Sequence, residues 1–234
     1  MQNKRMTIVV RVEFATMTNS AGELDMQKME RFIMVVSSLQ NYGANVIIVS
    51  SGAIMMGARK LGMKGEPTDH IAMQAAAAIG QAELIKMYQL YFDEYSQIAA
   101  QILLTNQVMD NPVRLKNAHN TFSRLLEMNI IPIVNENDTV STQDIELNDN
   151  YPLTLNVAKL VDADVMLLKS SESGKYLFIA TDNAVKRQMV EERFLTALLD
   201  EAARVFESGK DYIQRFQFPK TGIFPELFTQ TINK

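Results

Sequence analysis

The apolar stretch Ile131-Pro132-Ile133-Val134 runs directly into the polar stretch Asn135-Glu136-Asn137-Asp138. The apolar part is mostly β-branched, which is typical of a buried strand, and we predict a strand over residues 130–134. In open α/β sheets, ligands bind at the carboxyl ends of the strands. The stretch therefore predicts a strand that delivers amide and carboxylate groups to a binding site.

Predicted strands and helices alternate on both sides of this stretch. Further strands are predicted over residues 7–12, 45–50, 98–104, 165–168, 176–180 and 212–216. Apolar residues at three- and four-residue spacing predict helices over residues 26–42, 53–61, 71–95, 111–128, 153–161, 191–208 and 225–231. Residues 139–146 alternate weakly and are predicted to form a hairpin over the site. This order predicts one α/β domain over residues 1–234, in which helices and a mostly parallel sheet form alternating layers.

Composition excludes several classes of protein. The 234 residues carry a net charge of -4, which predicts no general affinity for nucleic acid. We find no apolar run long enough to span a membrane and no signal-peptide pattern, so we expect a cytoplasmic protein. Cysteine is absent, and the two histidines, His70 and His119, lie far apart, so we expect no metal site.

A second polar cluster, Ser50-Ser51-Gly52-Ala53, stands between a predicted strand and a predicted helix. The free amides of a helix N-terminus favour an anion such as a carboxylate or phosphate. The alternative is that Ser51 simply caps the helix. Likewise, the amides and acids of residues 135–138 either bind a ligand or hold their own loop together.

Four motifs, in this order and spacing, resemble the glutamate 5-kinases of the amino acid kinase family: residues 49–54 (VSSGAI), 78–81 (AIGQ), 101–105 (QILLT) and 131–140 (IPIVNENDTV). The resemblance covers residues 7–182. It implies a three-layer α/β/α sandwich and a reaction that transfers the γ-phosphate of ATP, as its magnesium complex, to the side-chain carboxylate of glutamate, the first step of proline synthesis. Many members carry a C-terminal RNA-modification-type domain, for which we expect this chain to be too short.

The resemblance implies that the amino-acid pocket is kept. Ser51 matches the serine at the substrate carboxylate, with Gly52 and Ala53 as its neighbours, and Asp138 matches the acid that holds the substrate ammonium. The remaining matches are polar positions of the same pocket, at Asn135, Asn137 and Asn150.

The phosphate site, in contrast, departs from the family pattern. Arg11 stands at the family lysine, which keeps the charge but changes the geometry. Glu13 stands at a glycine whose free amides face the triphosphate, and Phe14 and Ala15 lack the hydroxyl groups that the family has. A carboxylate about 4 Å from a phosphate charge costs about 4 kcal/mol at an effective dielectric constant near 20.

Three further family positions have changed. Tyr151 replaces an aspartate that organises the lysines around the transferring group, and a tyrosine with a pKa near 10 stays neutral. Lys169 and Ser170 replace the Thr-Asp of the nucleotide site. The glycine-rich nucleotide loop has no counterpart, because no glycine occurs between Gly174 and Gly209.

We therefore expect a glutamate 5-kinase-like protein with impaired or lost phosphoryl transfer and a retained site for glutamate or a similar amino acid. Residues 1–165 would form the amino-acid-binding part and residues 166–234 a shortened nucleotide-binding part. One alternative is an active kinase with a rebuilt phosphate site. Another is a non-catalytic regulatory subunit of a second amino acid kinase. Separately, the family resemblance implies that the chain forms a homo-oligomer.

Overall fold

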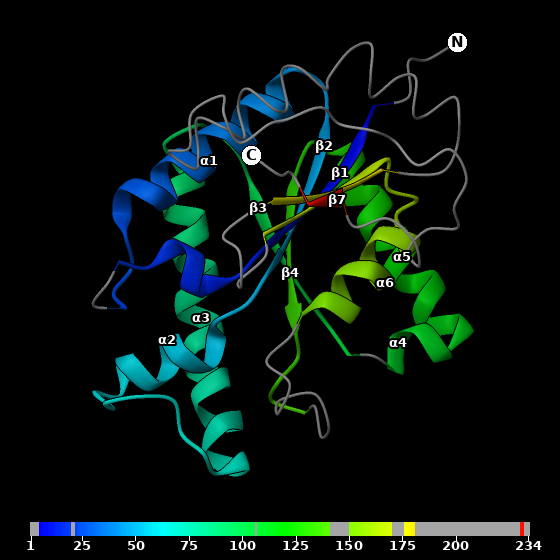
Figure 1. Ribbon diagram of the computed structural model, residues 1–234. Helices are drawn as coiled ribbons and strands as arrows, with labels where there is room; N and C mark the ends of the chain where they lie inside the picture. The colour runs from blue at the N-terminus through cyan, green and yellow to red at the C-terminus, as the bar shows by residue number, and fades with distance from the viewer. Residues whose placement is uncertain are drawn as a thin grey trace.

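The computed structural model describes residues 5–19, 22–105, 107–140, 150–169, 176–180 and 230–231. Within them, seven strands form one sheet: β1 (Thr7–Val12), β2 (Asn45–Ser50), β3 (Ala99–Leu104), β4 (Ile131–Glu136), β5 (Val165–Lys169), β6 (Tyr176–Ala180) and β7 (Gln230–Thr231). The strand order is β3-β4-β2-β1-β5-β6-β7 (Figure 1). The first five strands in this order pair in parallel, and β6 and β7 add antiparallel pairs at one edge. The predicted α/β class with a mostly parallel sheet is confirmed.

Helices cover both faces of the sheet and complete three layers. The helical segments are η1 (Phe14–Met17, a 3-10 turn), α1 (Met26–Asn41), α2 (Ala53–Lys60), α3 (His70–Asp93), α4 (Gln107–Asp110), α5 (Pro112–Glu127) and α6 (Tyr151–Leu160). Figure 1 shows α1, α2 and α3 on one side of the sheet and α4, α5 and α6 on the other. Alternate residues of β1 divide between the two cores, since Ile8 packs with α1 and α3 and Val9 packs with α5 and α6.

Side-chain caps explain where three of the helices begin. Asp25 accepts hydrogen bonds from two backbone amides at the start of α1, and Asp69 accepts one at the start of α3. Asn111 accepts two at the start of α5, where Pro112 takes the first helical position. These acids and amides each precede an apolar stripe, as the sequence pattern predicts.

Some predicted elements differ from the structure. The short helix α4 and the turn η1 were not predicted, because four residues are too few for a helical period to appear. The helix predicted over residues 225–231 is wrong at Gln230–Thr231, which pair with β6 as a strand. The elements predicted over residues 191–208 and 212–216 lie outside the described residues, as does most of the hairpin predicted over residues 139–146.

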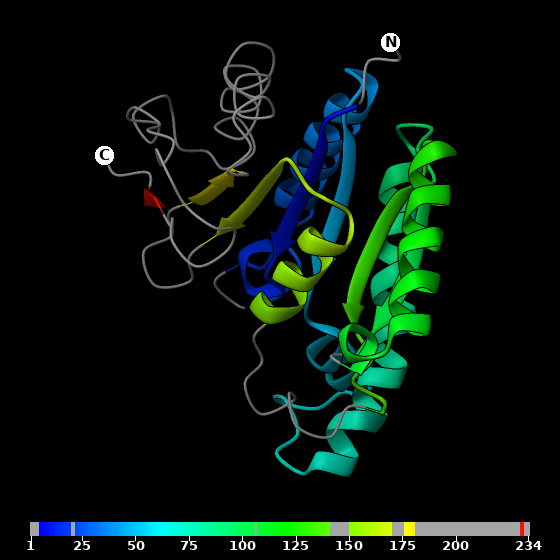
Figure 2. The same cartoon turned by 90° about the vertical axis from the view of Figure 1, so that its right-hand side faces the viewer.

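The topology brings three polar segments to one edge of the sheet. Strand β2 lies between β1 and β4, and all three are parallel, so their carboxyl ends meet. In the view turned by 90°, β1 and β2 run side by side (Figure 2). Glu13, Ser51 and Asn137 each follow the last residue of one of these strands. In the part of the chain that the structure describes, no helix is long and apolar enough to cross a membrane.

Candidate functional site

Hydrogen-bonded side-chain amides join β2, β4 and the residue before α6 at this edge. Asn135 is 2% exposed, and its Oδ1 accepts a hydrogen bond of 2.9 Å from Nδ2 of Asn150. Nδ2 of Asn150 also donates to the backbone carbonyl of Ser50 at 2.5 Å. The structure thus brings together two predicted site residues, Asn135 and Asn150, beside the strand end that precedes Ser51.

Strand β4 carries this polar chemistry inside the sheet. The predicted strand ended at Val134, but β4 continues through Asn135 and Glu136, which pair with Leu103 and Leu104 of β3. Both polar residues are buried. Asn135 is therefore no turn residue, and the hydrogen bonds of its side chain are made within the protein.

Ser51 holds the loop that follows β1. Its Oγ accepts a hydrogen bond of 3.2 Å from the backbone N–H of Phe14, and its own N–H donates to the carbonyl of Val12. The N-cap of α2 is Gly52, with φ of 97° and no side-chain cap, so the alternative that Ser51 caps this helix is wrong. Ala53, the first residue of α2, is 2% exposed and contacts the backbone of Gly80.

Phe14 fills the space in front of the α2 N-terminus. A Cβ placed on Gly52 would lie 2.3 Å from Cβ of Phe14, so the aromatic residue and the Gly52 backbone are in direct contact. Phe14 is 5% exposed, and the Arg59 guanidinium lies 5.8 Å from the centre of its ring. Phe14 therefore packs directly against the N-cap residue of α2.

Arg11 and Glu13 form an ion pair at the end of β1. Nη2 of Arg11 lies 3.0 Å from Oε1 of Glu13, and the two side chains are only 13% and 19% exposed. The carboxylate therefore compensates the one positive charge that the sequence places at the family's lysine position.

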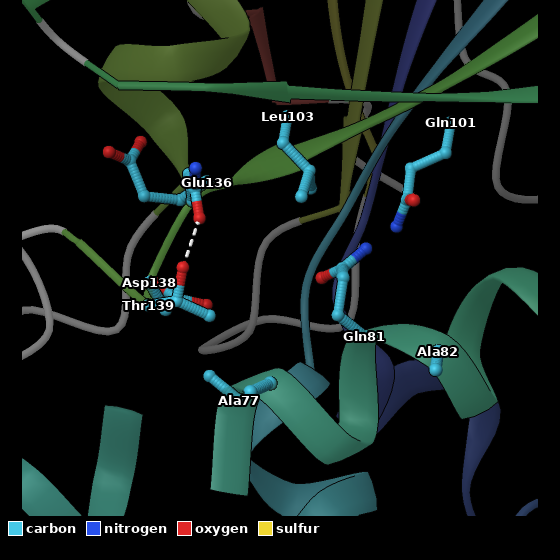
Figure 3. Close-up of a pocket in the computed structure, with 10 residues that line it drawn as sticks. Ala77, Gln81, Ala82, Gln101, Leu103, Glu136, Asp138 and Thr139 are labelled. Atoms are coloured by element: carbon cyan, nitrogen blue, oxygen red, sulfur yellow. Dashed lines mark hydrogen bonds between the residues drawn. The ribbon is translucent and has the colours of Figure 1, made fainter. Parts of the chain in front are cut away.

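A pocket of about 280 Å³ opens between α3 and the ends of β3 and β4. Its walls come from Ala77, Ala78, Gln81, Ala82, Gln101, Leu103, Glu136, Asn137, Asp138 and Thr139 (Figure 3). Small alanine side chains of α3 form one wall, and the acidic residues Glu136 and Asp138 lie at one end, away from Gln81 and Gln101 (Figure 3). Two predicted site residues, Asn137 and Asp138, line this pocket, whereas Ser51, Gly52 and Ala53 do not.

The pocket alters the chemistry of Asp138. Burial raises the pKa of its carboxyl from 3.8 to about 6, because water is removed from the charged form. Asn137 next to it serves the turn, since its Oδ1 accepts a hydrogen bond of 2.6 Å from Thr139. Of the two, Asp138 is the group whose charge an approaching ammonium would stabilise.

Four polar residues of the pocket wall were not predicted as site residues: Gln81, Gln101, Glu136 and Thr139. Gln81 and Gln101 occur inside two of the family-like motifs, so the motif spacing was a signal for them. Figure 3 shows Gln81 rising from α3 toward Gln101 on the opposite wall. Glu136 directly follows Asn135, but a strand was predicted to have ended before it.

The predicted phosphate site is described only in part. Tyr151 is the first residue of α6, and Lys169 is the last residue of β5, paired with Tyr176. Ser170 and the region between Gly174 and Gly209 where the glycine-rich loop would stand lie almost wholly outside the described residues. Among the described residues, no three histidine or acidic side chains cluster as a metal site would require. In the part of this site that the structure describes, the Arg11–Glu13 ion pair and Phe14 stand at the end of β1, where the family resemblance puts the lysine and the small residues of the phosphate site.

We compared the chain with known protein families. The model of the amino acid kinase family matches residues 7–176. The chain belongs to the amino acid kinase family. This chain thus shares the family's core from the first strand to the start of β6.

Curated relatives of this family member include proteins named glutamate 5-kinase. The protein of that name from Listeria welshimeri is 42% identical over 173 residues, which cover 72% of this chain and 63% of the relative. The glutamate 5-kinase of Carboxydothermus hydrogenoformans is 40% identical over 194 residues, which cover 82% of this chain and 50% of the relative. The chain therefore spans half to two thirds of the length of these relatives. Among solved structures, UMP kinase from Ureaplasma parvum aligns with a TM-score of 0.48 at 12% identity, covering 71% of this chain and 69% of the other.

Proposed function

We propose that this chain is a glutamate 5-kinase-like protein that binds glutamate or a closely related amino acid and has lost efficient phosphoryl transfer. The sequence identity to glutamate 5-kinases supports the amino-acid ligand. The remaining oxygen of Asn150 and the carboxylate of Asp138 are acceptors suited to an ammonium, and Ser51 follows the neighbouring strand β2. The reaction of the relatives would be ATP plus L-glutamate to ADP plus L-glutamyl 5-phosphate.

The observation that carries the loss of transfer is the ion pair of Arg11 and Glu13. Phosphoryl transfer depends on positive charge and free amides placed around the phosphates. Here the positive side chain at the end of β1 faces a carboxylate 3.0 Å away, so the charge available to a phosphate is much reduced.

Phe14 supports the same proposal independently. The family resemblance puts a small hydroxyl residue where this phenylalanine packs on Gly52. A triphosphate at the α2 N-terminus would have to displace a ring that is 95% buried, given its 5% exposure. Removal of one donor to a reacting oxygen commonly costs about two to three orders of magnitude in rate, and here several donors are changed together.

The division of the chain forms part of the proposal. Residues 1–165 would supply the amino-acid site, and residues 166–234, with Lys169 and Ser170, a shortened nucleotide part. A chain of this kind would act as a non-catalytic subunit, alone as a homo-oligomer or with an active amino acid kinase. Light scattering of the purified chain tests for the homo-oligomer. Co-purification from the native cell tests for an assembly with an active amino acid kinase.

The test combines ligand binding with turnover. Calorimetry with L-glutamate is expected to give saturable binding, and Asp138→Asn is expected to weaken it. Formation of γ-glutamyl phosphate from glutamate and magnesium ATP is expected to be below detection. Turnover of about 1 per second, the low end for typical kinases, would support the rebuilt-site alternative and contradict the lost-transfer proposal. Absence of glutamate binding would contradict the retained pocket.

A further inference from the structure

We infer that Gln81 is a positioning residue for the amino-acid site, because it orients Asn150 through Asn135. The identity of the ligand rests on the proposed function, whereas the positions of the residues rest on their hydrogen bonds. Gln81 stands on α3, is 9% exposed, and lines the pocket beside Asp138. Its Oε1 accepts a hydrogen bond of 2.8 Å from Nδ2 of Asn135.

Two backbone groups determine the direction of this hydrogen-bonded chain. The backbone N–H of Glu136 is a donor, and it bonds to Oδ1 of Asn135 at 2.9 Å. Since that atom is then the amide oxygen, the nitrogen of Asn135 faces Gln81. The carbonyl of Ser50 is an acceptor, so the atom of Asn150 that contacts it at 2.5 Å is the nitrogen. Neither amide can be reversed without loss of a backbone hydrogen bond.

The consequence concerns the atom that Asn150 leaves for a ligand. Both hydrogen bonds of the Asn150 side chain use Nδ2, toward Ser50 and Asn135. Its Oδ1 accepts no hydrogen bond from any residue that the structure describes. Because Ser50 and Asn135 both take Nδ2, Oδ1 of Asn150 is left as an acceptor, and Gln81 supports this arrangement by holding the side-chain amide of Asn135. An acceptor suits the ammonium of an amino acid and disfavours a carboxylate.

Gln81 is held in place by close packing of its own helix. A Cβ on the preceding residue, Gly80, would lie 1.7 Å from the carbonyl oxygen of Ala53 at the start of α2. The helix backbone thus contacts the segment that carries Ser51, Gly52 and Ala53. This close packing of Gly80 on Ala53 fixes the position of α3, and therefore of Gln81, relative to α2.

The test replaces the acceptor without changing the shape. Gln81→Met keeps the side-chain length and removes the strong acceptor, and Gln89→Met, on the exposed face of the same helix, is the control. By calorimetry, Gln81→Met is expected to weaken L-glutamate binding about tenfold, and the control less than twofold. In an Asn150→Ala background, Gln81→Met is expected to cause no further loss, because its effect passes through Asn150. An unchanged affinity in Gln81→Met, or an equal loss in both backgrounds, would overturn the inference.

A measurement on the native chain keeps the inference testable without any ligand. The side-chain NH2 groups of Asn135 and Asn150 are both hydrogen-bonded inside the protein, so their protons are expected to exchange with water far more slowly than those of the exposed Asn120. Fast exchange at Asn135 would refute the role of Gln81, whatever binds. If exchange is slow and glutamate does not bind to the native chain, the proposed function fails and the hydrogen-bonded chain stands.

Discussion

The raised pKa of Asp138 predicts a specific pH dependence of glutamate binding. With a pKa of about 6, the carboxyl is about nine-tenths ionised at pH 7 and about one-tenth ionised at pH 5. If the ionised form holds the ligand ammonium, the affinity for L-glutamate falls about tenfold between these values. The ligand contributes little, because a glutamate side chain with a pKa of about 4.3 stays mostly ionised at pH 5.

Calorimetry at pH 5, 6, 7 and 8 measures this change, and Asp138→Asn is the matched control. The variant is expected to bind more weakly at pH 7 and to lose the pH dependence, because its amide does not titrate. A native affinity that is constant from pH 5 to pH 7 would refute the assignment of Asp138 to the ammonium. A pH dependence that persists in Asp138→Asn would assign it to another group.

Asp138 also makes the free energy of unfolding depend on pH, in the direction opposite to that of glutamate affinity. Folding raises the pKa from 3.8 to about 6, so the folded state binds this proton more tightly than the unfolded state. The contribution of Asp138 to the free energy of unfolding is therefore greatest below pH 4 and is lost as the pH rises through 6. A shift of about two units corresponds to about 3 kcal/mol. Ammonium binding opposes this loss, so glutamate should raise the melting temperature more at pH 7 than at pH 5.

Three substitutions test the packing around the site by thermal or denaturant unfolding. Gly80→Ala is expected to destabilise the fold by about 3 kcal/mol or more, because its Cβ would lie 1.7 Å from the backbone oxygen of Ala53, whereas Gly65→Ala, in open space, should change little. Phe14→Ala should cost about 3–5 kcal/mol as a buried aromatic truncation, and a cost under 1 kcal/mol would contradict its tight contact with Gly52. Asn111→Ala should cost about 1 kcal/mol, since two backbone amides lose their cap at the start of α5.

Much of the fold could be predicted because its signals are local. The β-branched run of Ile131 to Val134 and the cap at Asn111 each depend on a few neighbouring residues. The roles of Asn135 and Asn137 could not be read in this way. Both are asparagines of one polar cluster, yet Asn135 is buried in β4 and Asn137 supports an outer turn. The different roles of the two asparagines follow only from the pairing of β4 with β3 and from the packing of α3 beside β4.

Gln81 illustrates the same limit for the site. It lies 54 positions before Asn135, and its hydrogen bond exists because the fold packs α3 against the end of β4. A single glutamine on a helix has no local pattern that indicates this partner. The motif at residues 78–81 indicated that this segment belongs to the site, but the hydrogen bond between Gln81 and Asn135 could be identified only from the folded structure.

At the proposed phosphate site, the residues that differ from the family pattern are accommodated by one another. Glu13 alone would repel a phosphate, but beside Arg11 it forms a compensated pair that is largely shielded from water. Phe14 belongs to the apolar core and packs directly on Gly52, which has no side chain to push it away. Each replacement is accommodated by its neighbour, so reversal of one would leave the other in place. Under the proposed loss of transfer, Glu13→Gly is expected to remove the carboxylate that faces Arg11 but to leave Phe14 packed on Gly52, so we expect restored nucleotide binding only when Phe14 is replaced as well.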